Sequence, residues 1–153
     1  MLPSFTEHGL LPPGIHDCSL QDAYDYFCTN DHRRRIWDGL LNFIELMKFY
    51  GIDRDYIILD GSFVTDKSIP SDIELVFPVD ITDGHYAALC MQFFSYYHNI
   101  VKTHLLVDFY PNLSGGNDFS AFFQYIGGKT GMIKGLNPKD LKGILRVASW
   151  ANV

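Results

Sequence analysis

Apolar residues recur at helical spacing between residues 31 and 50, which is the clearest pattern in the chain. Five of them fall at i, i+4, i+7, i+8 and i+11: Ile36, Leu40, Phe43, Ile44 and Met47. This spacing predicts a helix that buries one face, and Gly51 is a suitable stop. A shorter helix is expected over 20–28, with Ser19 as its N-cap and Asp22 as its capping partner. Another helix is expected over 83–98.

Short β-rich runs separate these helices. Strands are predicted over 56–60, 72–77, 103–110, 119–126 and 141–147. Polar or glycine-rich segments join them: a loop over 63–71, a turn over 112–118 and a connection over 127–140. The order of elements predicts an α/β (α+β) fold, with a mixed β-sheet flanked by helices. We expect an extended N-terminal arm over 1–16 and a single domain over 17–153.

Two carboxylates stand at alternate positions where one strand begins. If residues 72–75 are extended, Asp72 and Glu74 point to one face while Ile73 and Leu75 point into the core. Neighbouring carboxylates repel each other unless a positive charge lies between them. Mg²⁺ favours carboxylate and phosphate oxygens as ligands. The pattern therefore indicates metal-assisted phosphoryl chemistry.

Asp108 is a third candidate, because a carboxylate among Leu106, Val107 and Phe109 is costly to bury without a partner. On a strand beside the first two acids, it would complete a site of three carboxylates. Such sites hold two cations about 4 Å apart. We therefore expect a two-metal Mg²⁺ site formed by Asp72, Glu74 and Asp108.

Gly61 and Ser62 are the expected phosphate contacts, since a turn without bulk lets backbone N–H groups approach a triphosphate. Asp60 precedes this pair and either caps the turn or faces the site. Lys67, in the following loop, is a candidate for phosphate binding; the alternative is a solvated lysine.

Arg33, Arg34 and Arg35 begin a helix, the unfavourable end for cations. They fan over about 200°, so all three cannot face one ligand. We expect one of them, with Arg34 as the candidate, to pair with a phosphate or a site carboxylate. The alternative is that these arginines are solvated or form surface ion pairs.

The Gly-Ser pair, a spacer, an Asp-x-Glu strand and a later strand Asp together resemble the nucleotidyltransferase superfamily of DNA polymerase beta. Glu74 is a departure, because the superfamily more often has Asp there. Four segments also look like a family of small bacterial nucleotidyltransferase-like proteins: 11–16, 33–35, 59–65 and 142–147. The resemblance covers about residues 11 to 147 and implies a minimal nucleotidyltransferase fold.

The resemblance implies Mg²⁺-dependent transfer of a nucleoside monophosphate from an NTP, with ATP as the expected donor, to a protein or RNA acceptor. Asp108 would help to deprotonate the acceptor hydroxyl, as the resemblance to the superfamily implies. The alternative is a catalytically weak nucleotide-binding protein, or an antitoxin or partner-binding protein, with the same fold. A toxin partner or a homo-oligomer is compatible with either.

The composition of the chain limits the classes of partner that we expect. The formal charge of −6 argues against broad nucleic-acid affinity, so no DNA partner is expected. No apolar run approaches the roughly 20 residues of a membrane span. The three cysteines and six histidines lack zinc-ligand spacing. We expect a cytoplasmic protein without a membrane partner.

Overall fold

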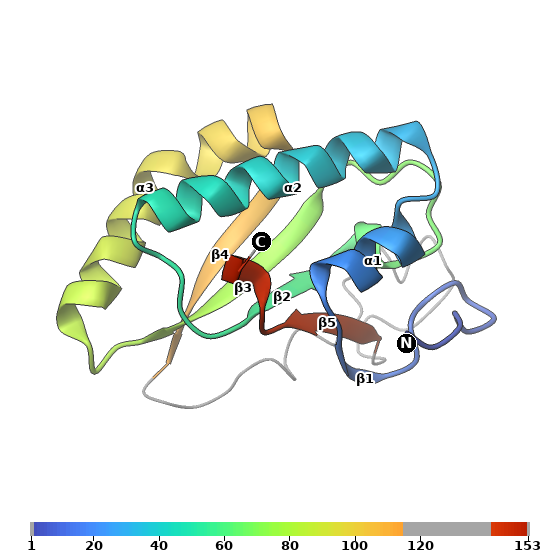
Figure 1. Cartoon of the computed structure of the whole chain (residues 1–153), viewed down its shortest axis with the longest axis horizontal. Helices are drawn as coiled ribbons and strands as arrows, with labels where there is room; N and C mark the ends of the chain where they lie inside the picture. The colour runs from blue at the N-terminus through green and yellow to red at the C-terminus, as the bar shows by residue number, and fades with distance from the viewer. Residues whose placement is uncertain (1, 115–141, 153) are drawn as a thin grey trace.

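In the part of the chain that the structure describes, five strands form one mixed sheet in the order β1-β5-β2-β3-β4 (Figure 1). The computed structural model describes residues 2–114 and 142–152. The strands are β1 (Gly14–Asp17), β2 (Ile57–Asp60), β3 (Ile73–Asp80), β4 (Val107–Ser114) and β5 (Gly143–Val147). β1 is parallel to β5 and β3 is parallel to β4, whereas β2 is antiparallel to both of its neighbours. The predicted mixed α/β fold is confirmed.

Three α-helices cover one face of this sheet (Figure 1). They are α1 (Leu20–Phe27), α2 (Asp31–Phe49) and α3 (Gly84–Leu105). The capping box predicted for α1 is present, because the Ser19 hydroxyl accepts from the Asp22 N–H and the Asp22 carboxylate accepts from the Ser19 N–H. Asn30 caps α2 by accepting from the Arg33 N–H. The predictions of α1 and α2 are confirmed.

The main core lies between the helices and the sheet. Alternate strand residues face it, including Leu59 on β2, Leu75 on β3 and Phe109 on β4, and all three are fully buried. The apolar stripe predicted for 31–50 is the face that α2 buries here. α2 and α3 approach closely at Gly39, where a Cβ would collide with the backbone carbonyl of Leu105. The intervening strand residues face the other way, so this packing determines which side chains remain for a site.

Several predicted boundaries are wrong. The strand predicted over 72–77 is β3, which begins at Ile73 and continues to Asp80, so Asp72 precedes it. α3 continues to Leu105, so residues 103–105 are helical rather than the start of a strand. The short apolar run in this segment is compatible with either a buried helix or a buried strand. The helix ends where Leu106 adopts a left-handed backbone with φ of 58°. Residues 112–114 were expected in a turn, but they continue β4, because each has a register partner on β3.

The N-terminal arm packs against the domain. Its last residues form β1, which pairs with β5, and Leu10 forms an isolated bridge with Thr65. Leu2 and Leu11 are buried in the main core. The strand predicted over 141–147 is observed as β5. The strand predicted over 119–126 and the connection over 127–140 lie outside the described residues.

Within the described residues, none of the helices combines the length and the apolar character that crossing a membrane would require.

Candidate functional site

Three carboxylates lie in one row across three neighbouring strands. Asp60 on β2 pairs in register with Glu74 on β3, and Glu74 pairs with Asp108 on β4. All three alternate with core residues, so they occupy the side of the sheet away from Leu59 and Leu75. Asp72 comes just before β3, two positions before Glu74. We call Asp60, Asp72, Glu74 and Asp108 the acid row.

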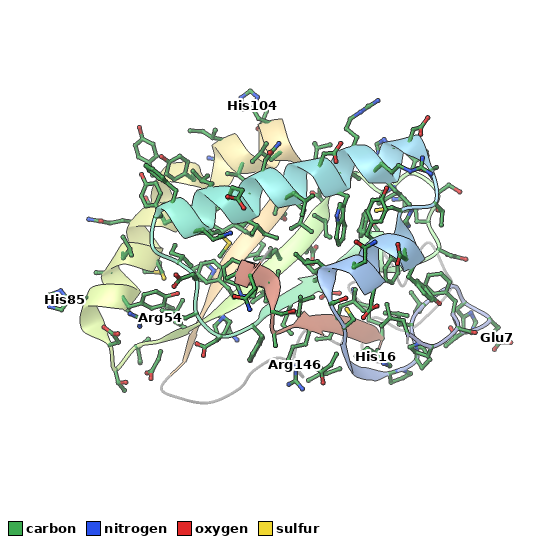
Figure 2. The ribbon with its side chains drawn as sticks, in the orientation of Figure 1. Glu7, His16, Arg54, His85, His104 and Arg146 are labelled. Carbon is green, nitrogen blue, oxygen red and sulfur yellow. The ribbon has the colours of Figure 1, made fainter. Side chains whose placement is uncertain are left out.

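The same side of the sheet carries a small apolar cluster and an ion pair. Ile58, Val76 and Ile144 form the buried part of this second cluster. Arg146, two positions after Ile144, points away from the helices (Figure 2), and its guanidinium donates to both carboxylate oxygens of Asp17. The acid row therefore borders an apolar patch rather than open polar strand.

Gly61 forms the turn that leads out of β2 against the acid row. Its φ is +83°, a left-handed conformation in which glycine is favoured. A Cβ at this position would lie 3.0 Å from Cγ of Glu74. Ser62 then begins the short 3₁₀-helix η1 (Ser62–Val64). The backbone of the predicted phosphate turn thus passes directly beside a predicted metal ligand.

Glu74 is the electrostatic centre of the acid row. Burial raises the pKa of its carboxyl, and the charges of Asp60, Asp108 and Asp72 raise it further. The ammonium of Lys142 acts in the opposite direction. The carboxylates of Asp60, Asp72 and Asp108 are therefore close enough to act on Glu74.

Asp60 forms a buried ion pair with Lys142, which precedes β5. The Lys142 Nζ lies 2.6 Å from Asp60 Oδ1, and both side chains are less than 10% exposed (7% and 5%). Of the two roles left open for Asp60, the register with Glu74 favours the one that faces the site.

Three side chains contact the carboxylate of Asp108. His98 Nε2 donates to Oδ1 at 3.0 Å, and the Tyr110 hydroxyl donates to Oδ2 at 3.1 Å. Lys102 Nζ lies 3.5 Å from Oδ2. His98 and Lys102 come from α3, whereas Tyr110 lies on β4 itself. These contacts give the buried carboxylate hydrogen-bond partners. They offset the cost of burial that made Asp108 a candidate.

Arg33 is the arginine of the three that reaches toward the site loop. Its five N–H donors bond to the carbonyls of Phe27, Phe63, Thr65 and Lys67. The guanidinium is buried and holds the segment after Ser62 in place, with no donor left for a phosphate.

Arg34 and Lys67 lie differently from the acid row. Arg34 Nη1 forms a largely exposed ion pair with Asp31 at 2.7 Å. The side chain of Lys67 is exposed, and its backbone carbonyl is an acceptor for Arg33. The structure thus brings together Gly61, Asp72, Glu74 and Asp108, and it gives Arg34 a local surface partner.

The donors of the acid row suit Mg²⁺, which prefers carboxylate oxygens. Burial raises the pKa of Glu74, and the neighbouring carboxylates add to this effect, so a cation bound beside it would lower that pKa. Over residues 2–114 and 142–152, no three or more His, Cys, Asp or Glu side chains stand as a ready ligand set.

Sequence reasoning missed four partners: His98, Lys102, Tyr110 and Lys142. His98 and Lys102 are at helical i, i+4 spacing, but the expected helix ended at residue 98. Tyr110 is two positions from Asp108, and strand alternation alone would have placed both on one face. No local signal pairs Lys142 with Asp60, because the two are 82 residues apart in the sequence.

Comparisons with known proteins place the chain in a family without assigning an activity. A family model described as a family of unknown function (DUF6932) matches residues 3–148. Neither the curated proteins nor the solved structures gave a match. Since the matched region covers almost the entire sequence, the chain belongs to the DUF6932 family of unknown function.

Proposed function

We propose that this protein is a Mg²⁺-dependent nucleotidyltransferase of the DNA polymerase beta type. It moves a nucleoside monophosphate from an NTP, with ATP as the expected donor, to a hydroxyl of a protein or RNA. One observation carries the proposal: Glu74 and Asp108 are direct register partners on neighbouring strands, with Asp72 two positions before Glu74. Carboxylates gathered at the start of two adjacent strands can supply the ligands that a metal-assisted phosphoryl transfer requires.

Each group has a role in this proposal. Asp72, Glu74 and Asp108 hold the metal, which supplies positive charge to the triphosphate. Gly61 and Ser62 bind the phosphates through a turn that passes beside Glu74. Asp108 accepts the proton of the attacking hydroxyl. Lys67 remains a candidate for an outer phosphate contact, because its side chain is exposed in the loop that follows the turn.

A second function has one observation in its favour. Both oxygens of Asp108 already accept from His98 and Tyr110, and Lys102 lies beside them. A carboxylate held in this way suits a protein that binds nucleotide, or a partner such as a toxin, with little or no turnover. The same test separates the two functions.

The test is transfer of label from each α-phosphate-labelled NTP, with Mg²⁺ and with a cell lysate as the source of acceptors. Wild type is compared with the double variant Asp72→Asn/Glu74→Gln. Asp80→Asn is the matched control, because Asp80 is an exposed carboxylate at the far end of β3. Label that depends on Mg²⁺ and on the acid row, but not on Asp80, supports the transferase.

Two other results are informative. Nucleotide binding without transfer supports the binding protein. If the folded wild type neither binds nor transfers any nucleotide, both functions are wrong.

A further inference from the structure

Tyr110 places a hydroxyl group against the carboxylate proposed as the base. It stands two positions after Asp108 on β4, and its Oη donates to Asp108 Oδ2 at 3.1 Å. Tyr110 as a residue is 40% exposed, although its hydroxyl donates to a carboxylate side chain that is only 11% exposed. An acceptor hydroxyl in the proposed reaction needs this contact, because its proton must pass to Asp108.

The ring of Tyr110 is held on its α3 side. Its centroid lies 5.2 Å from that of His98 and 5.9 Å from that of Phe94. His98 also donates to the other oxygen of Asp108. One histidine therefore positions both the carboxylate and the phenol, so their contact is part of a packed arrangement rather than a chance surface hydrogen bond.

We propose that Tyr110 is an acceptor for the nucleotide within its own chain, so that the protein modifies itself. The inference rests on the proposed function and names one substrate of the same site. Tyr110 Oη attacks the α-phosphorus of the bound NTP, and the bond between that phosphorus and the bridging oxygen to the β-phosphate breaks. Pyrophosphate leaves with the electron pair, and the phenolic proton passes to Asp108 Oδ2. The product is a phosphodiester between Tyr110 and a nucleoside monophosphate.

The test is the intact mass of the purified full chain, before and after incubation with Mg²⁺ and each NTP, followed by peptide mapping. We expect one added nucleoside monophosphate on Tyr110, either already present or gained during incubation. Tyr110→Phe removes the adduct completely, and so does Asp72→Asn/Glu74→Gln. Tyr96→Phe is the matched control, because Tyr96 is an exposed tyrosine on α3 with 70% exposure, and it keeps full labelling.

Two further measurements separate the inference from the proposed function. The first is the fractional rate of self-labelling, which is independent of protein concentration when Tyr110 reacts in its own chain. The second is label transfer by the wild type to lysate acceptors. Transfer to the lysate without any label on Tyr110 overturns the inference and leaves the proposed function intact. Label on a residue of the chain other than Tyr110 likewise overturns the inference and leaves the proposed function intact. Absence of both self-labelling and lysate transfer in the folded protein overturns both.

Discussion

Arg33 and Asp108 are both buried charges, yet their partners differ in kind. Arg33 donates all five of its N–H groups to backbone carbonyls, whereas Asp108 is contacted by the side chains of His98, Lys102 and Tyr110. Backbone partners cannot move away without unfolding the segment that carries them, but side chains can change rotamer. Arg33 therefore fixes the site loop, whereas the carboxylate of Asp108 is held by side chains that can move.

The same contrast extends along β3. Leu75 is fully buried in the main core, and Glu74 beside it belongs to the acid row on the opposite face. Alternation along one strand therefore separates a residue that serves stability from one that serves the site. Variants on the two faces of the strand test this separation.

Replacing Arg33 gives the largest loss of stability. Arg33→Met leaves the carbonyls of Phe63, Thr65 and Lys67 without their donor, and we expect about 4 kcal/mol lower free energy of unfolding. The measurement is urea denaturation. Arg35→Met, on the exposed part of the same helix, changes it by about 0.5 kcal/mol or less. Equal urea midpoints for the two variants would show that the hydrogen bonds of Arg33 do not stabilise the loop.

Leu75→Ala tests the core face of β3. Removing a fully buried leucine leaves a cavity, and we expect a loss of about 3 kcal/mol in the same denaturation experiment. Glu74→Gln changes the neighbouring residue without removing volume, and we expect stability equal to or above that of the wild type. A large loss in Glu74→Gln would mean that the carboxylate contributes to folding rather than to a ligand site.

We expect the buried Asp60–Lys142 pair to contribute more to the free energy of unfolding than the more exposed Asp17–Arg146 pair. Lys142→Met leaves a buried carboxylate without its counter-charge and costs about 2 kcal/mol or more. The double variant Asp60→Asn/Lys142→Met recovers most of this loss. Asp17→Asn, which breaks the exposed pair with Arg146, costs about 0.5 kcal/mol. Similar losses for the two single variants would contradict the assigned difference in burial.

The pH dependence of Glu74 is the smallest effect. Its pKa is raised in the folded protein, so the folded state holds the proton more tightly than the unfolded state. The stability that this contributes is complete below the unfolded pKa, near 4.5, and is lost as pH rises through the folded value. Without Mg²⁺, Glu74→Gln should therefore gain on the wild type as pH rises from about 4 and then level off. A gap that closes over this range would reverse the assigned sign.

Much of the fold follows from local sequence, but its boundaries do not. The spacing of Ile36, Leu40 and Phe43 was sufficient for α2, and Ser19 with Asp22 for the start of α1. The end of α3 depends on the left-handed residue Leu106, which an apolar run cannot reveal.

The candidate site divides in the same way. Strand alternation was enough to predict that Glu74 faces away from Leu75, whereas Asp72, expected on the same face, lies just before β3. The register that brings Asp60 and Asp108 beside Glu74 is a property of the whole sheet. Arg33 was noticed as an unusual cation at a helix start, but its carbonyl partners lie mostly about 30 residues away in the sequence.

The most direct test of the acid row as a metal–nucleotide site is calorimetric titration with a non-hydrolysable ATP analogue, with and without Mg²⁺. We predict binding by the wild type that requires Mg²⁺, is retained in Asp80→Asn and is weakened by about tenfold or more in Glu74→Gln, a loss of about 1.4 kcal/mol. Equal binding by wild type and Glu74→Gln, or binding unaffected by Mg²⁺, would contradict the account.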